Sequence, residues 1–432
     1  LAQLRSLVVR PSSVIAKYQR KEIDPREAGR EMEVEAVLSA GFLRSGDKMR
    51  VTAQLLDVLS GEILWSDRID SESSDIFALQ DIIAFRILNG LELELTSHEQ
   101  EKLGKRATEN AAAYEEYLRG RDNFGRFVFR TLALADCNAA IENFKRSIEM
   151  DSKFALAHSG LGACYANRVF KGMGDTKDYD RAETAFGHAI QLDPNVVESR
   201  VLMAFIYLSR GEKKKARGEI NRLQEQFPND ASLYFAKAVL HRLDGEYDRA
   251  LRSWDKLERL DPAARVVASY NRARVYAYQG DNERALAELD KGAQIEPDHP
   301  LIKIFRARIL FYHGAVEEAT ATMREVLAEN PHLEGMRPIL AILLASKGNF
   351  EEAREQMTER ALQMAQADHD MAYWTASAFA LLEERDLAFE WLERAIKLGN
   401  ENLGWFERDR NWDKLRDDPR FESLMQGIEE ND

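Results

Sequence analysis

The sequence contains few cysteines, few prolines and no long apolar run. Two cysteines, Cys137 and Cys164, occur in 432 residues, and two thiols cannot build a disulfide framework. No stretch approaches the roughly 18 consecutive apolar residues that a membrane-spanning helix needs. The chain also lacks a starting methionine and a signal peptide, so we expect Leu1 to lie inside a longer protein.

Basic residues are outnumbered by acidic ones. The chain has 60 Lys and Arg against 74 Asp and Glu, which gives a formal net charge of −14. Sequence-independent binding to nucleic acid or to an anionic membrane needs a basic field. We therefore expect no direct nucleic-acid partner and no attachment to an acidic membrane surface.

Signals of catalysis and metal binding are missing as well. None of the eight histidines lies three to five residues from another, so no helical pair can hold a metal ion. No nucleophile and base stand in a recognisable arrangement, and no glycine-rich phosphate loop is complete. The sequence thus predicts a non-enzymatic chain with no cofactor and no metal, although a catalytic domain can lie upstream.

What the sequence does contain is an internal repeat. Prolines and glycines recur in one phase, with steps of 34 or 35 residues, at Pro194, Pro228, Pro262, Pro297 and Pro331 and at Gly211, Gly245, Gly280, Gly314 and Gly348. Alanines from Ala182 to Ala353 keep the same step. Self-similarity at one fixed period is typical of stacked repeat architectures.

Each repeat predicts a pair of antiparallel helices. In one unit the helices span 197–209 and 213–226, and Gly211 ends the first because glycine adopts the left-handed conformation without steric cost. Pro228 stops the second, since proline lacks an N–H and disfavours helix in the residue before it. One pair cannot bury its apolar face alone, so the pairs are expected to stack into an all-α superhelical solenoid.

This pattern resembles the tetratricopeptide repeat family. The small residue, glycine turn, alanine, aromatic and proline of that family match Ala238, Gly245, Ala250, Trp254 and Pro262. We expect about eight units over residues 114–400. Residues 401–432 carry further aromatic residues and are expected to form C-terminal capping helices, because solenoid ends expose an apolar face.

The first hundred residues predict a small α+β domain. Apolar stretches of period two at 34–43, 49–58 and 63–68 are separated by short turns, which predicts antiparallel hairpins. Helices are expected over 25–32, capped by Asp24, and over 75–95, and a short strand over 7–9. The domain is assigned to residues 1–97, with a first part upstream of Leu1, and residues 98–113 form a linker or helix extension.

This domain resembles the TolB amino-terminal-like (FlgO-like) domain. The resemblance rests on the string Arg50-Val51-Thr52-Ala53-Gln54-Leu55, on Asp57, Gly61, Leu64 and Trp65, and on 75–80; it continues through 117–121 and 415–421. It implies the C-terminal regulatory half of a bacterial class III cyclase, serine/threonine kinase or winged-helix regulator, with that catalytic or DNA-binding domain upstream. It also implies a bacterial cytoplasmic location. A periplasmic location, as for an envelope adaptor, remains the alternative.

The concave side of the solenoid is the first candidate binding site. The first helix of each pair lines that side, which predicts a groove formed by Phe205, Phe235, Arg242, Tyr270, Asn271, Arg274, Tyr278, Arg308, Phe311 and Tyr312. Arginines flanked by aromatic rings suit an acidic or C-terminal peptide. Alternatively, these arginines pair with acids on neighbouring helices, which would favour a scaffold over a receptor. Asn271 is the one match to the clamp of chaperone-binding tetratricopeptide domains, so chaperone tails are disfavoured.

Two longer turns form the second candidate. Insertions in a repeat array project from one edge and can contact partners, which points to Phe124, Arg126, Phe127, Arg130, Phe170 and Lys171. Alternatively, these residues extend helices that pack on the N-terminal domain, because clustered Phe usually marks a core.

The sequence therefore favours a protein- or peptide-binding regulatory module of a bacterial signalling protein, with the groove as the binding site. A structural scaffold or homodimerisation domain without a ligand, or an envelope adaptor, is the alternative. If the groove is open, Arg274→Glu with Arg308→Glu should abolish capture of an acidic partner and leave the fold intact.

Overall fold

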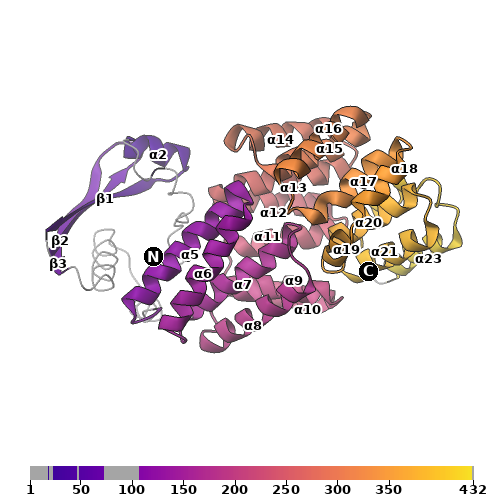
Figure 1. The fold of residues 1–432 in the computed structure, drawn as a ribbon. Coiled ribbons are helices and arrows are strands. Elements are labelled where there is room, and N and C mark those ends of the chain that lie inside the picture. The colour runs from indigo at the N-terminus through magenta and orange to yellow at the C-terminus, as the bar shows by residue number, and fades with distance from the viewer. Residues whose placement is uncertain (1–17, 19–22, 46–47, 73–106, 431–432) are drawn as a thin grey trace.

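The described residues of the N-terminal part form one helix against a three-stranded antiparallel sheet (Figure 1). The computed structural model describes residues 18, 23–45, 48–72 and 107–430. Helix α2 spans Pro25–Glu31. Strands β1 (Ala36–Ser45), β2 (Lys48–Asp57) and β3 (Ile63–Glu72) lie in the order β1-β2-β3. The expected strand over 7–9 and helix over 75–95 lie outside the described residues.

Local signals explain how this sheet and helix meet. The Asp24 side chain accepts a hydrogen bond from the backbone N–H of Arg26 at 2.9 Å, which caps α2 as predicted. A Cβ at Gly29 would lie 2.4 Å from a Val58 methyl, so glycine allows α2 to approach the sheet closely. Val51 and Ile69 face each other across β2 and β3 and are both buried. The predicted helix and hairpins are therefore confirmed.

The rest of the described chain is helical. Consecutive helices pair as α5 (Ala111–Arg126) with α6 (Leu134–Met150), α7 (Ala155–Phe170) with α8 (Thr176–Leu192), α9 (Val197–Ser209) with α10 (Lys213–Gln226), α11 (Ala231–Leu243) with α12 (Tyr247–Leu260), α13 (Arg265–Tyr278) with α14 (Asn282–Ile295), α15 (Pro300–His313) with α16 (Val316–Glu329), α17 (Arg337–Ser346) with α18 (Phe350–Gln356), and α20 (His369–Leu381) with α21 (Arg385–Lys397). The predicted fold class, a small α+β domain followed by a superhelical solenoid of helix pairs, is confirmed. Among the described helices, none is both long enough and apolar enough to cross a bilayer.

The repeat glycines end the first helix of their units as predicted. Gly211 has φ +78°, and its N–H donates to the carbonyl of Leu208 at 2.8 Å. The last unit lacks this glycine, and Glu383 takes the left-handed conformation there with φ +64°. Tertiary packing therefore imposes the same turn on a residue that does not favour it.

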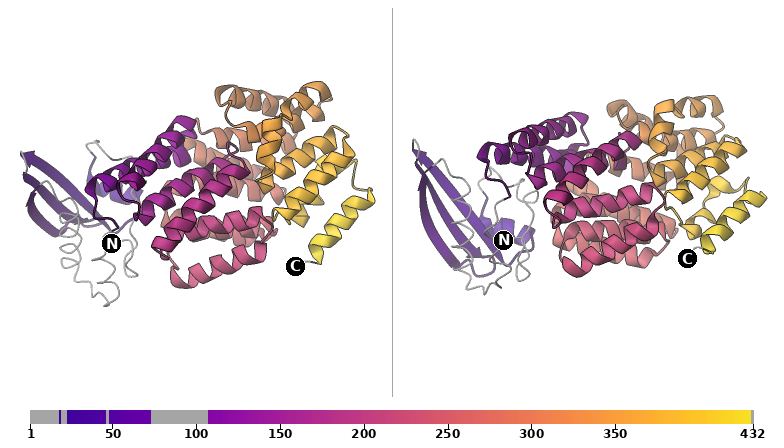
Figure 2. Two further views of the ribbon diagram at one scale, coloured as in Figure 1. Left: turned by 60° about the horizontal axis from the view of Figure 1, so that its bottom comes forward. Right: turned by 90° about the horizontal axis from the view of Figure 1, so that it is seen from below.

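The superhelix closes on itself, because its first two units contact its last three. The N–H of Gly335, in the short helix η4 (Glu334–Met336), donates to the carbonyl of Gly172 at 3.0 Å. His332 Nε2 lies 3.0 Å from the carbonyl of Leu132. Arg360 and Asp175 form an ion pair at 2.6 Å. The sheet and α23 (Pro419–Glu429) lie at opposite ends of the resulting body (Figure 2).

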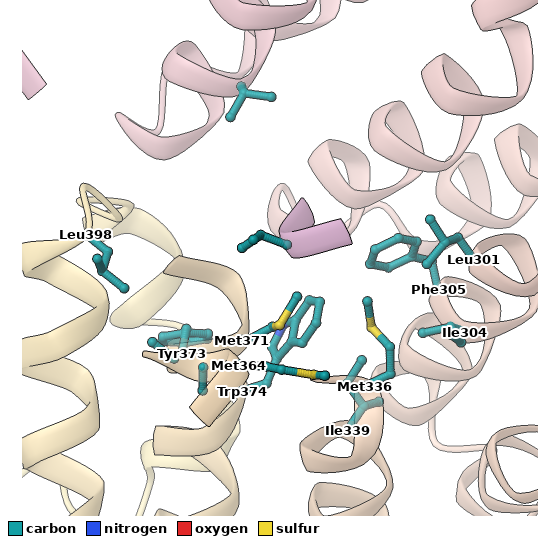
Figure 3. Close-up of a cluster of buried hydrophobic side chains, with 14 of the residues drawn as sticks. Leu301, Ile304, Phe305, Met336, Ile339, Met364, Met371, Tyr373, Trp374 and Leu398 are labelled. Atoms are coloured by element: carbon teal, nitrogen blue, oxygen red, sulfur yellow. The ribbon is translucent and has the colours of Figure 1, made fainter. Parts of the chain in front are cut away.

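A cluster of buried apolar side chains stabilises the closed superhelix (Figure 3). It joins α15, η4, α17, α20 and the extra helix α19 (Glu359–Ala365). Its members are 4% exposed or less: Leu301, Ile304, Phe305, Met336, Ile339, Met364, Met371, Tyr373 and Trp374. Because each large apolar side chain contributes about 1.5–3 kcal/mol on burial, this cluster makes closure strongly favourable.

The segment before α23 also turns inward. The N–H of Glu401 donates to the carbonyl of Leu243 at 3.0 Å, and the Tyr247 hydroxyl donates to Asn402 at 2.6 Å. Helix α22 (Leu403–Phe406) and the short helix η5 (Arg410–Trp412) follow. Residues expected to cap the end of the solenoid therefore also fill its interior.

The closure predicts a strict requirement for glycine at position 335. A Cβ there would lie 2.9 Å from the Gly172 backbone and 2.6 Å from the Met371 sulfur, so Gly335→Ala should lower the free energy of unfolding by about 1–3 kcal/mol. Gly218 lies within α10 with nothing within 4 Å of its Cβ position. Gly218→Ala should leave stability unchanged or raise it by up to about 1 kcal/mol. Urea unfolding of both variants checks this, and equal effects would contradict the close contact.

Candidate functional site

The predicted groove residues lie on the inner side of α9, α11, α13 and α15, but they are covered. Arg242, Arg274 and Arg308 are 2%, 7% and 8% exposed. Buried with them are Phe205, Tyr270, Asn271, Tyr278 and Phe311, and Phe235 and Tyr312 are half-buried. The expectation of an open groove is wrong, because α20 and the segment after α21 occupy the space.

Asp370 is the charged centre of the filled groove. One of its carboxylate oxygens lies 3.0 Å from Arg242 Nη1; the other lies 3.0 Å from Arg242 Nη2 and 2.7 Å from Arg274 Nη2. Burial alone would raise the pKa of Asp370, but the Arg242 and Arg274 guanidinium groups outweigh burial and hold that pKa well below its usual range. The arginines thus pair with an acid on another helix of the same chain, which was the alternative to binding an acidic partner.

Local structure fixes the position of this carboxylate. The Asp368 side chain accepts hydrogen bonds from the N–H groups of Asp370 and Met371 at 2.9 and 3.0 Å, which caps α20. Asp370 therefore lies in the first turn, where the helix dipole favours a negative charge. Because residues 370–380 are all buried, α20 forms the central helix of the closed body.

Aromatic rings pack beside the arginines of the groove. The Arg274 guanidinium lies 4.9 Å from the Phe305 ring centre, and that of Arg308 lies 5.0 Å from the Trp374 ring centre. Guanidinium groups are attracted to the faces of aromatic rings at such distances. The combination of arginines and aromatics predicted for ligand recognition therefore stabilises the protein's own interior.

Asp409 is a second buried acid, which the sequence analysis missed. Its carboxylate accepts hydrogen bonds from the Tyr373 hydroxyl at 2.7 Å and from the Tyr312 hydroxyl at 3.2 Å. Asp409 is fully buried, and burial raises its pKa. One signal was present: Asp409 lies between Trp405 and Trp412, where an acid among aromatics indicates a buried hydrogen-bonded group.

The predicted edge residues are also placed differently from the expectation. Phe124, Phe127 and Lys171 are 7%, 0% and 6% exposed. The Lys171 ammonium donates to the Tyr270 hydroxyl at 2.9 Å, and Phe170 packs edge-on against Phe205. These four residues therefore pack inside the repeat body rather than projecting from its edge or joining the N-terminal domain.

The remaining two edge candidates stay exposed but paired. Arg126 lies 3.5 Å from Asp136, and Arg130 lies 3.9 Å from Glu296. Exposed ion pairs of this kind contribute at most about 1 kcal/mol. They give no sign of a binding site at this edge.

Two other groups bear on metal or redox chemistry. Ligand atoms of His241, Asp244 and Glu246 lie within 4.8 Å of one another, but Asp244 pairs with Lys213 at 2.6 Å and also with Arg217. We assign no metal to these residues, because their charges are already compensated.

Cys137 and Cys164 are buried free thiols. Burial raises the pKa of Cys137 to about 12 and raises the pKa of Cys164 well above its usual value. Both thiols therefore stay protonated at neutral pH. Protonated buried thiols are inert, because the thiolate is the reactive form.

Comparison with known proteins supports the repeat assignment. Tetratricopeptide repeat models match residues 175–240, 270–334 and 340–402. The chain is 30% identical over 161 residues to putative adenylate cyclase 3 of Rhizobium meliloti, covering 37% of this chain and 27% of that protein. It is 23% identical over 170 residues to anaphase-promoting complex subunit 3 of Schizosaccharomyces pombe, covering 39% and 24%.

A solved structure of human IFIT1 with m7Gppp-AAAA is also similar in fold, at 14% identity and a TM-score of 0.49, covering 74% of this chain and 80% of that one. The match to the two curated relatives covers about a quarter of the length of each. The matched segments are tetratricopeptide repeats, which agrees with the helix pairs of the structure.

The Asp370 contacts predict a large loss of stability in Asp370→Ala. This substitution leaves Arg242 and Arg274 buried without their common partner, which should cost about 3–5 kcal/mol. Asp298→Ala, at a side chain that is 96% exposed, should cost under about 0.5 kcal/mol. Equal unfolding midpoints in urea would contradict the proposed role of Asp370. For the same reason, Arg274→Glu with Arg308→Glu should now disrupt the fold, against the expectation from the sequence.

Buried His299 predicts a pH-dependent stability. It is 1% exposed and stacks on Tyr270; burial, and then Lys171, lowers its pKa from 6.5 to about 3. Between pH 6.5 and about 3, the unfolded chain therefore binds a proton at His299, whereas the folded chain does not. His299 contributes full stability above pH 6.5, and about 1.4 kcal/mol per pH unit is lost as the pH falls toward 3. Urea unfolding at pH 7, 6, 5 and 4 should show a shallower loss in His299→Phe, and parallel losses would contradict it.

Proposed function

We propose that this chain is a non-catalytic protein-interaction module that serves a regulatory role in a bacterial signalling protein, and that it binds its partner on the outer surface of the closed repeat body. The observation that carries the proposal is the tetratricopeptide array itself, matched over residues 175–240, 270–334 and 340–402. Stacked helix pairs offer extended surfaces for protein partners.

The signalling context rests on two further observations. The small α+β unit comes directly before the repeat array, an order that resembles regulatory halves of bacterial cyclases and kinases. The identity to putative adenylate cyclase 3 supports the same context over 161 residues. On this proposal a catalytic or DNA-binding domain precedes the chain, and the protein lies in the bacterial cytoplasm.

Energetics argue for the outer surface over the groove. Opening the groove would expose Met371, Tyr373 and Trp374, each 3% exposed or less. Their burial is worth about 5–9 kcal/mol at 1.5–3 kcal/mol each. An acidic ligand would regain only the contacts that Asp370 already makes with Arg242 and Arg274, so it has no advantage over the chain's own helix.

One observation favours the alternative, a scaffold or homodimerisation domain. Arg242 and Arg274 are bridged to an acid, which was the sign expected of a scaffold. The bridge removes the groove as a receptor and leaves the outer faces available in both cases. The two candidate functions therefore differ in what binds the outer faces. An interaction module binds a different protein there, and a homodimerisation domain binds a second copy of this chain.

Capture from the native lysate distinguishes them. The natural full-length protein would be immobilised, cross-linked to bound proteins and analysed by mass spectrometry, with heat-denatured protein as the control. We expect a different protein to be enriched on the folded form, with cross-links on the outer helices. Recovery of its own copies alone, with a doubled particle mass in solution, would favour the scaffold and contradict the proposed function.

A further inference from the structure

A basic cleft lies between α10, α11 and α12. Its volume is about 490 Å³, within the range of ligand pockets. Its lining residues are Arg217, Ile220, Asn221, Tyr234, Lys237, Leu240, His241, Arg249, Arg252 and Ser253. Tyr234, Lys237 and His241 follow one side of α11 at steps of three and four residues, so this side differs from the one that carries Arg242 into the filled groove.

The charge of this cleft is of one sign. Four of its lining residues are permanent cations, and none is a carboxylate, in a chain whose net charge is −14. Arg217 pairs with Asp244, and Arg249 pairs with Glu246 at 2.6 Å. Burial lowers the pKa of His241 against the opposing effect of its hydrogen bond with Glu246.

Of the four cations that line this cleft, Lys237 and Arg252 have no partner among the residues that the structure describes. Within residues 107–430, neither makes a hydrogen bond or ion pair to another side chain. Lys237 is half-buried and Arg252 is exposed. Below them Ile220 and Leu240 are buried, so the cleft has an apolar floor, and Asn221, Tyr234 and Ser253 add hydrogen-bonding groups to its wall.

A second cleft, of about 400 Å³ between α6, α7 and α8, provides the contrast. Its cations are already compensated: Lys145 lies 3.0 Å from Glu142, and Arg168 and Arg181 lie 3.5 and 3.0 Å from the buried carboxylate of Asp178. Both clefts are hollow and rich in basic side chains. Of these two clefts, only the one between α10, α11 and α12 has cations, Lys237 and Arg252, that are not paired with a carboxylate of the described residues.

We propose that the cleft between α10, α11 and α12 binds an acidic segment of a partner polypeptide, with carboxylates at Lys237 and Arg252. This deepens the proposed function and rests on it. The cations are distributed over three helices, which suits several single charges along a peptide. The negative charge of the rest of the chain repels a long polyanion such as nucleic acid, and the apolar floor accommodates side chains between the acidic ones.

The test measures binding of a fluorescein-labelled peptide of four Asp-Glu repeats to the full chain by anisotropy, with an Asn-Gln peptide of equal length for comparison. The acidic peptide should bind at least tenfold more tightly, and Lys237→Ala with Arg252→Ala should remove that preference, because each charge-assisted bond is strong. The control variant, Lys145→Ala with Arg181→Ala, loses the same charge from the second cleft and should bind within about twofold of the native chain. Circular dichroism confirms that both variants fold.

Three results would overturn the assignment: equal loss of affinity in both variants, equal binding of the two peptides, or a clear preference for a phosphoserine peptide over the acidic one. Capture from the lysate distinguishes a failure of the cleft assignment from a failure of the proposed function. If the lysate still yields a partner and Lys237→Ala with Arg252→Ala captures it as well as the native chain does, the cleft assignment fails alone. If the acidic peptide binds but capture yields no partner, the proposed function fails alone.

Discussion

The arrangement of the helical body depends on one carboxylate that must not be buried alone. Removing Asp370 from water costs several kcal/mol unless it is paired and hydrogen-bonded, and Arg242 and Arg274 supply that pairing at 2.7–3.0 Å. Replacing a buried ion pair by apolar residues is often neutral or stabilising, so such a pair is weak evidence for net stability. The apolar cluster around Trp374 provides the free energy of closure. Asp370 fixes how α20 sits against α11 and α13, because a one-turn shift would leave three charges unpaired.

Closure changes how stability is shared along the array. In an open repeat array each unit contacts its neighbours, and stability is roughly a sum of local terms. Here Lys171 bonds Tyr270, Arg360 pairs with Asp175 and His332 meets Leu132. Units far apart in sequence therefore stabilise one another. Disruption at Gly335 or Asp370 should therefore destabilise the whole helical body, because the contacts of these residues join units that are not neighbours in sequence.

The sequence predicted what is local and missed what is distant. The spacing of Gly211 and Pro228 follows from backbone conformation alone, so it defined the helix pairs, and the same holds for Asp24 at the start of α2. The curvature of the whole array cannot be predicted in this way. It is the sum of small rotations between successive units, and the periodic residues do not determine that sum. The inner face of the solenoid could be identified; the segment that fills it could not. One signal was available: residues 370–380 lack a polar face, which is typical of a helix buried on all sides.

The closed body also connects the basic cleft to the N-terminal unit by a short path. Helix α12, which carries Arg249 and Arg252, leads into the short helix η3 (Pro262–Ala264). Ala263 packs against the cluster of Ala28 and Met32, and Arg265 lies 3.4 Å from Glu33. From there α13 runs on to Arg274 and so to Asp370. Because a ligand shifts a conformational equilibrium only by its differential affinity for the two states, occupancy of the cleft can act on the N-terminal unit only if it changes how α12 and η3 sit. The contact of Arg265 with Glu33 is the point at which such a change would reach the N-terminal unit.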